Sequence, residues 1–147
     1  MHFVDTNVLV YSVNSAAPEH ARCRGLVQSW SAGREPWGTT WSVVYEFLRV
    51  STHPRIFPVP LPAGRAWEIV EALRASPSFH LLVESDRHAE LLRLTLAEVP
   101  LLSGNVLHDV HTAVVMREHG VRRIYTRDTD FHRFPFLEVI DPMAGGG

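Results

Sequence analysis

The segment His2-Phe3-Val4-Asp5-Thr6-Asn7-Val8 carries the pattern that decides the fold. Residues 2–4 predict a short buried strand, and the apolar stretch 8–13 that follows predicts a helix. Asp5 therefore lies where a strand gives way to a helix. In parallel sheets ligands bind beyond the carboxyl ends of the strands, so this acid is a candidate site residue.

Short apolar strands alternate with helical patterns along the rest of the chain. Further strands are predicted at residues 37–40, 79–83, 123–126 and 137–140. Helices are predicted at 18–28, 41–50, 63–74, 86–99 and 106–119; Asp86 would favour the start of one and Asn105 would cap another. Four prolines within residues 52–62 predict an extended connector. The alternation predicts an α/β sandwich with a mostly parallel sheet.

Length and composition describe a single globular domain. The chain has 147 residues, of which 46% are hydrophobic and 20% charged, values typical of a folded domain. Its apolar runs are too short to span a membrane, and its N-terminus lacks the pattern of a signal peptide. Cys23 is the only cysteine, which excludes an intramolecular disulfide and a zinc site built on several thiolates. We expect a soluble, cytoplasmic protein in which Cys23 is a small buried hydrophobe.

The charge balance disfavours a purely electrostatic binder of nucleic acid. Sixteen acidic residues oppose fourteen basic ones, all of them arginine, for a formal net charge of −2. No basic run stands out, as such a binder would require. An enzyme acting on nucleic acid remains possible, because a metal ion can supply positive charge and arginine is well suited to phosphate.

Five acids fall where one crevice would need them. Asp5 ends the first strand, Asp128 and Asp130 follow a later strand, and Glu46 and Asp109 lie on helices that could border the same crevice. Converging carboxylates repel one another unless a cation neutralises them. Only oxygen ligands are available, which favours Mg²⁺ or Mn²⁺. Such a metal beside an open coordination position is the usual apparatus for hydrolysing phosphodiesters.

Each of these acids taken alone has an ordinary explanation. Asp5 would serve as a helix cap, and Glu46 would form a solvated ion pair with Arg49. Asp109 would be stabilised by its helix dipole, and Asp128 and Asp130 would be loop acids. The prediction of an acidic site therefore depends on the four segments together.

At four places in order, the sequence resembles the signature segments of PIN-domain ribonucleases. These segments are Phe3-Val4-Asp5-Thr6-Asn7-Val8, Glu46-Phe47, His108-Asp109 followed by Ala113, and Thr126-Arg127-Asp128-Thr129-Asp130-Phe131. Within that family the chain looks most like the VapC-type toxins of bacterial toxin–antitoxin pairs. The resemblance is carried further by residues 47–50 and 53–57, which are similar to a subgroup common in actinobacteria.

The resemblance implies a PIN-like three-layer sandwich with a central sheet of five parallel strands. We assign residues 1–142 to this domain and expect residues 143–147 to form a flexible glycine-rich tail. The family pattern implies a homodimer that cuts RNA and is held inactive by a cognate VapB-type antitoxin.

The resemblance also assigns roles within the site. It implies Mg²⁺ or Mn²⁺ held by Asp5, Asp109 and Asp130, with Glu46 and Asp128 completing the acidic pocket, Asp128 being the less constant position. Thr6, Asn7 and Thr126 match positions that support the pocket through hydrogen bonds. The metal would activate a water, and Glu46 or Asp130 would orient it or take its proton.

Three arginines are candidates for binding the phosphates that flank the cleaved bond: Arg49, Arg127 and Arg133. The alternative for each is an ordinary surface ion pair. His108 and His111 share a helix face, but they lack the further ligands that a zinc site needs. We therefore expect them to be surface or partner-facing histidines.

Other functions remain open from the sequence alone. The same fold and chemistry would serve a housekeeping RNA-processing nuclease or a DNA-directed one. Asp128-x-Asp130 superficially resembles phosphatase motifs, so a small-molecule phosphohydrolase is a second alternative. A non-catalytic interaction module, whose acidic pocket docks an arginine from a partner, is the third class.

Overall fold

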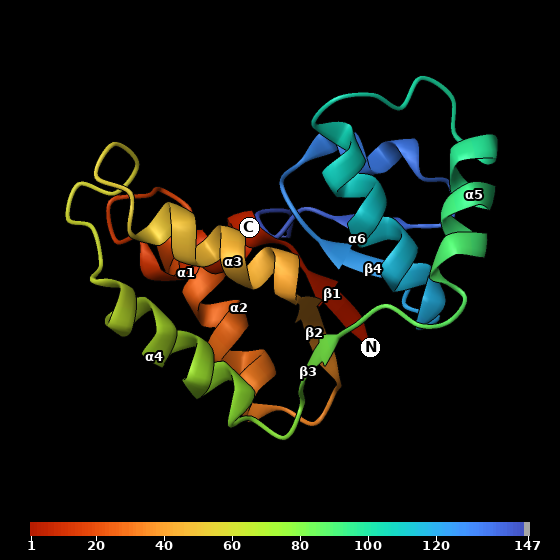
Figure 1. Ribbon diagram of the computed structural model, residues 1–147. Helices are drawn as coiled ribbons and strands as arrows, with labels where there is room; N and C mark the ends of the chain where they lie inside the picture. Colours follow the sequence, from red (N-terminus) through yellow and green to blue (C-terminus); the bar gives the residue numbers. More distant parts are fainter. Residues whose placement is uncertain (146–147) are drawn as a thin grey trace.

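Five parallel strands form a single sheet at the centre of the protein, whose computed structural model describes residues 1–145 (Figure 1). The strands are β1 (His2–Val4), β2 (Trp37–Thr40), β3 (Phe79–Leu82), β4 (Arg123–Tyr125) and β5 (Glu138–Ile140). Their order across the sheet is β3-β2-β1-β4-β5, and every neighbouring pair is parallel. The predicted parallel sheet is therefore confirmed, and all five strands lie where the sequence indicates them.

Helices cover both faces of this sheet, with α1 to α4 on one side and α5 and α6 on the other (Figure 1). The helices are α1 (Thr6–Val13), α2 (His20–Ala32), α3 (Trp41–Ser51), α4 (Ala63–Arg74), α5 (His88–Glu98) and α6 (Val106–Glu118), and a short 3₁₀ helix, η1, spans Thr129–Arg133. Helix α1 packs on α2 and α3, whereas α5 packs on α6. This arrangement is the predicted three-layer α/β sandwich.

Strand β1 lies in the middle of the sheet. Phe3 and Val4 are fully buried, and Phe3 is in register with Gly38 on one side and Ile124 on the other. A strand buried on both faces is expected to be a continuous apolar run. The central position places the residue that follows β1, Asp5, at the middle of the sheet's carboxyl edge.

Two predicted helix boundaries and one predicted helix cap are wrong. Helix α2 runs on to Ala32, since Trp30 packs 4.7 Å from the rings of both His2 and Tyr125. Helix α5 begins at His88 rather than at residue 86, because the segment before it is held in a turn. Asn105 does not cap α6, as its backbone is already helical and its side chain makes no capping hydrogen bond.

Residues 52–62 form neither helix nor strand, as their prolines predict. The connector is nevertheless anchored. Phe57 is buried, and the Leu61 N–H donates to the carbonyl oxygen of Ser51 at 2.9 Å. The predicted buried state of Cys23 is also confirmed, and burial raises the pKa of its thiol to about 11.

None of the helices within residues 1–145 is long and apolar enough to cross a membrane. The predicted glycine-rich tail begins in a turn, where the Met143 N–H donates to Asp141 Oδ1 at 2.9 Å. Its last two residues, 146 and 147, lie outside the described part of the chain.

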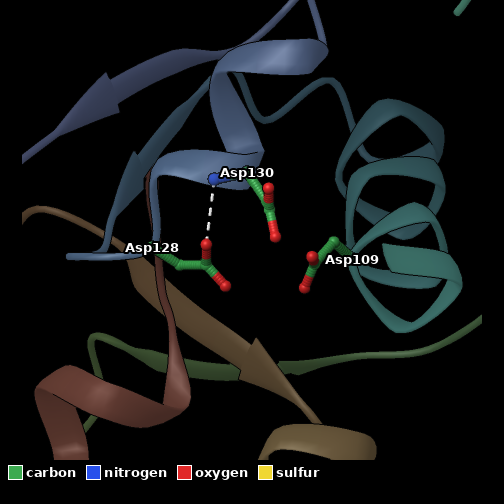
Figure 2. Close-up of side chains that lie close together, drawn as sticks. All are labelled: Asp109, Asp128 and Asp130. Atoms are coloured by element: carbon green, nitrogen blue, oxygen red, sulfur yellow. Dashed lines mark hydrogen bonds between the residues drawn. The ribbon is translucent and has the colours of Figure 1, made fainter. Parts of the chain in front are cut away.

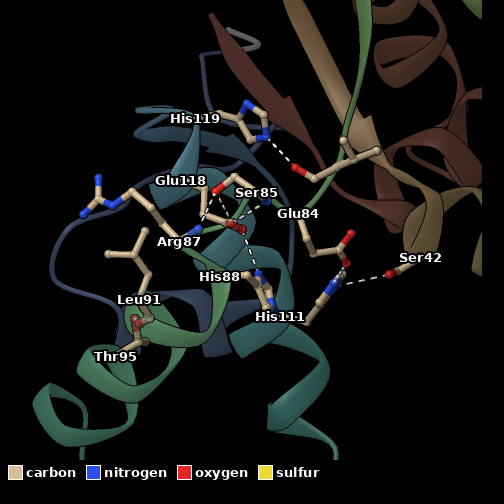
Figure 3. A network of polar contacts seen from close by, with 11 residues as sticks. Ser42, Glu84, Ser85, Arg87, His88, Leu91, Thr95, His111, Glu118 and His119 are labelled. Carbon is tan, nitrogen blue, oxygen red and sulfur yellow. Dashed lines mark hydrogen bonds and ion pairs between the residues drawn. The ribbon is translucent and has the colours of Figure 1, made fainter.

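The buried carboxylate of Glu118 joins α6 to the start of α5 (Figure 3). It accepts hydrogen bonds from the Ser85 N–H and Oγ, both at 2.7 Å, and pairs with His88 Nδ1 at 2.8 Å. Burial alone would raise the pKa of Glu118, but the hydrogen bonds from His88 and Ser85 outweigh it and lower the pKa. This contact fixes the helix pair that covers the second face of the sheet.

Gly38 is expected to be intolerant of a side chain. A Cβ atom there would lie 2.2 Å from the carbonyl oxygen of His80 on the neighbouring strand. Gly38→Ala should therefore lower the free energy of unfolding by about 3 kcal/mol, measured by urea denaturation. Gly25→Ala is the matched control, because a Cβ at this helical position meets nothing within 4 Å; it should stabilise the protein slightly. Equal stability of the two variants would contradict this account of β2.

Candidate active site

The structure brings all five predicted acids to one cavity of about 870 Å³. Asp5 is the N-cap of α1, Glu46 lies within α3, and Asp109 lies in the first turn of α6. Asp128 is the N-cap of η1, and Asp130 lies within that helix. The remaining lining residues are Ser42, Val43, Tyr45, Arg49, Asn105, His108, His111 and Thr112. We call this space the acidic cavity.

Three of the acids that line the cavity form a tight group. A carboxylate oxygen from each of Asp109, Asp128 and Asp130 lies within 4.8 Å of the others, and the three side chains face a common point (Figure 2). The Asp130 N–H donates to Asp128 Oδ1 at 2.9 Å, which fixes the start of η1. The structure thus groups Asp128, and not Asp5, with Asp109 and Asp130.

Asp5 is held in place by its neighbours. Its Oδ1 accepts from the Thr6 N–H at 2.8 Å, and its Oδ2 accepts from Asn7 Nδ2 at 2.9 Å and Thr126 Oγ1 at 2.7 Å. Thr126 Oγ1 in turn accepts from the Asp128 N–H at 2.9 Å. Oδ1 of Asp5 keeps a free lone pair after these contacts.

Burial raises the pKa of Asp5, although the hydrogen bonds from Thr126 and Thr6 oppose part of that rise. The nearby charges of Asp128 and Glu46 raise the pKa further. The three residues that the sequence predicts to support the pocket, Thr6, Asn7 and Thr126, all contact this carboxylate.

Glu46 lies on α3 and lines the same cavity. Its Oε2 accepts from Thr6 Oγ1 at 3.2 Å, and its Oε1 lies 3.8 Å from a guanidinium nitrogen of Arg49. The side chains of both residues are more than half exposed, so their ion pair contributes little to stability. Ser42, Glu46 and Arg49 are spaced four and three residues apart on this helix, and all three line the cavity.

Asp109 has a strongly perturbed carboxyl group. The pKa of Asp109 is raised to about 7, first by desolvation and then by the negative charges of Asp128, Asp5, Asp130 and Glu46. Full ionisation of the group at neutral pH is therefore opposed by mutual repulsion. A hard divalent cation would remove that repulsion, and the all-oxygen donor set fits Mg²⁺ or Mn²⁺.

The three candidate arginines differ in position. Arg49 lines the cavity, and Arg133 Nε lies 3.4 Å from Asp130 Oδ1 at its edge. Arg127 is not among the lining residues, because its guanidinium pairs with Glu19 at 2.6 Å and with Asp141 at 3.6 Å. For Arg127 the structure thus shows the ion-pair alternative.

The two histidines of α6, His108 and His111, line the cavity; His108 is exposed, as predicted, and His111 is half-buried. His111 lies between Ser42 of α3 and Glu84, with Nδ1 3.2 Å from Ser42 Oγ and Nε2 2.6 Å from Glu84 Oε1 (Figure 3). Ser42, Tyr45 and Thr112 also line the cavity, although they were not among the predicted site residues. The helical spacing of Ser42 from Glu46, and of Thr112 from Asp109, could have indicated two of them.

Comparison with known proteins agrees with this geometry. The PIN domain family model matches residues 2–137. Ribonuclease VapC43 of Mycobacterium tuberculosis is 35% identical over 142 residues, covering 97% of this chain and 95% of that protein. Ribonuclease VapC48 of the same species is 31% identical over 141 residues, and the match covers 96% of this chain and 97% of VapC48.

Solved structures show the same fold. Mycobacterium tuberculosis VapC20, described as a Sarcin-Ricin loop cleaving toxin, superposes with a TM-score of 0.66 at 22% identity, covering 96% of this chain and 100% of that one. VapBC2 from Rickettsia felis, bound to a DNA fragment from its promoter, gives a TM-score of 0.67 at 15% identity, covering 95% and 96%. The chain belongs to the PIN-domain family and, by its curated relatives, to the VapC-type ribonuclease toxins within it.

Proposed function

We propose that this VapC-type protein is a Mg²⁺- or Mn²⁺-dependent endoribonuclease that hydrolyses RNA phosphodiesters in the cytoplasm. The observation that carries the proposal is the group of three carboxylates, Asp109, Asp128 and Asp130, whose oxygens lie within 4.8 Å of one another. Asp5 and Glu46 line the same cavity. The ribonuclease names of the curated relatives supply the substrate class.

Asp109, Asp128 and Asp130 would hold the cation, and Asp5 lines the same cavity. When bound, a divalent cation lowers the pKa of a water ligand and stabilises negative charge on the phosphate in the transition state. This assignment adds Asp128 to the ligands predicted from the sequence and moves Asp5 to the border of the site, where its hydrogen bonds to Thr126 and Asn7 hold it.

The remaining side chains orient the reacting groups. Glu46 is steadied by Thr6 and presents its second carboxylate oxygen at the cavity wall, where it would orient the attacking water and accept its proton. Arg49 and Arg133 flank the acids and would bind neighbouring phosphates. The position of Arg127, paired with Glu19, supports a structural role for that residue.

A VapB-type antitoxin is the partner that we propose, and a homodimer the working form. Solved relatives include VapBC2 with promoter DNA and a toxin–antitoxin complex from Klebsiella pneumoniae, the latter superposing with a TM-score of 0.63 at 17% identity. Those assemblies are properties of the relatives, and the shared fold supports the same arrangement here. The nuclease domain would comprise residues 1–142.

Removal of metal or of Asp109 is expected to abolish RNA cleavage. Purified protein should cut total cellular RNA into discrete fragments with Mg²⁺ or Mn²⁺ and stop when EDTA is added. Asp109→Asn should reduce the rate at least about a hundredfold, because it weakens the cation site. Asp86→Asn is the matched control, since Asp86 is exposed and lies outside the cavity. Fragments that persist in EDTA or with Asp109→Asn would overturn the proposed function.

The stability of the metal-free protein should depend on Asp109 in a defined pH window. Because the pKa of this carboxyl is raised from 3.8 to about 7, its protonation favours the folded state at low pH. That contribution is complete below about pH 4 and is lost as pH rises through about 7. Asp109→Asn has no carboxyl group to ionise at this position, so its stability should not fall for this reason as the pH rises.

Urea denaturation in EDTA measures this difference. The free energy of unfolding of Asp109→Asn, minus that of the parent protein, should rise by about 1–2 kcal/mol between pH 4 and pH 8, after allowance for solvent screening. Asp86→Asn should follow the parent. An advantage that does not change with pH would show that the acids do not repel one another in the folded state.

A further inference from the structure

Tyr45 is an exposed aromatic residue on the wall of the acidic cavity. It directly precedes Glu46 on α3, lines the cavity, and is 70% exposed, the highest value for an aromatic residue within residues 1–145. In that part of the chain its ring joins none of the aromatic pairs and its hydroxyl none of the side-chain hydrogen bonds. Packing within this chain therefore does not account for the residue.

Helix α3 places Tyr45 in a row of side chains suited to nucleic acid. Trp41, Tyr45 and Arg49 are spaced four residues apart, so they share one face of the helix at intervals of about 6 Å. The Arg49 side chain is 63% exposed and lines the cavity, whereas Trp41 does not line it and its ring stacks on that of Trp67. Tyr45 and Arg49 thus present an unstacked ring and a guanidinium beside the five carboxylates.

Electrostatics make such a row useful at this site. The net charge of the chain is −2, and the acids of the cavity repel phosphate wherever a cation does not neutralise them. Affinity for RNA must then come largely from contacts that do not depend on net charge. Stacking of a base on an aromatic ring is such a contact, and it tolerates any base because every base has a π face.

We propose that the ring of Tyr45 stacks on an unpaired base adjacent to the phosphate that is cleaved. Stacking requires a base that is free of its neighbours, so Tyr45 would select for unpaired nucleotides at the cleavage site. This inference rests on the proposed ribonuclease function, since it names a substrate contact of the same cavity. Tyr45 is a specificity residue here and takes no part in bond cleavage.

Fluorescence of 2-aminopurine tests the contact without requiring cleavage. The probe is a short, uridine-rich, single-stranded RNA with 2-aminopurine moved through successive positions, mixed with protein carrying Asp109→Asn. Quenching is expected at one position. Tyr45→Leu should remove it, because leucine is apolar but has no π face, whereas Tyr45→Phe should retain it.

Kinetics on the active protein supply the second measurement. Tyr45→Leu should raise KM about 5- to 150-fold with kcat nearly unchanged, and Tyr45→Phe should restore KM. Leu96→Ala is the control, because Leu96 is an exposed apolar residue of α5 outside the cavity. It should leave both constants unchanged.

The outcomes separate this inference from the function on which it rests. If the unaltered protein cuts no RNA but the Asp109→Asn protein shows quenching that depends on Tyr45, the stacking contact is supported and the proposed nuclease is overturned. Two results would overturn the stacking contact alone. One is that Tyr45→Leu leaves both KM and the quenching unchanged; the other is that the Asp109→Asn protein with Tyr45 intact shows no quenching at any position. A loss of mass in sedimentation for Tyr45→Leu would assign the ring to contact with a second copy and would also overturn it.

Discussion

The pairing of β1 with β4 is the constraint on which the acidic cavity depends. These neighbouring parallel strands end side by side, and the hydrogen bond from Thr126 Oγ1 to Asp5 Oδ2, 2.7 Å long, joins their carboxyl ends. Thr126 also accepts from the Asp128 N–H. One hydroxyl thus ties the acid that follows the first strand to the acid that follows the fourth, although they are far apart in the sequence. Without this pairing the carboxylates would not share a cavity.

Burying these carboxylates close together lowers the stability of the folded protein, and the rest of the fold must compensate. The raised pKa values of Asp109 and Asp5 show this cost, because desolvation of the charged carboxylate is the leading cause of both shifts. The scaffold beneath them is a sheet whose central strand is fully buried, covered on its second face by a helix pair joined through Glu118. Such strain is characteristic of binding sites whose ligand relieves it. A divalent cation is the ligand that fits this charge.

Most of the fold could be predicted from the sequence because it follows from local patterns. The alternation of strand and helix gives the parallel sheet, and the position of Asp5 after an apolar strand places it at the ligand-binding edge. The errors arise where neighbours override a local signal. Asn105 is a good cap by composition but enters α6 with helical backbone dihedrals, and Ser85 is held by Glu118, so that α5 begins later than expected.

What the sequence could not indicate are contacts between distant segments. Arg127 lies beside the acids in the sequence, yet it pairs with Glu19, 108 residues away. His111 is bound between Glu84 and Ser42, which belong to other elements. The short helix η1, which brings Asp130 to face Asp109, has no clear periodic signature. Such partners are settled only by the folded chain.

Anomalous diffraction from crystals soaked in Mn²⁺ tests directly whether this cavity is a divalent-cation site. We expect a strong anomalous peak between the carboxylates of Asp109, Asp128 and Asp130, absent from crystals of Asp109→Asn. A peak elsewhere with this group empty, or no peak in soaked crystals of the unaltered protein, would contradict it.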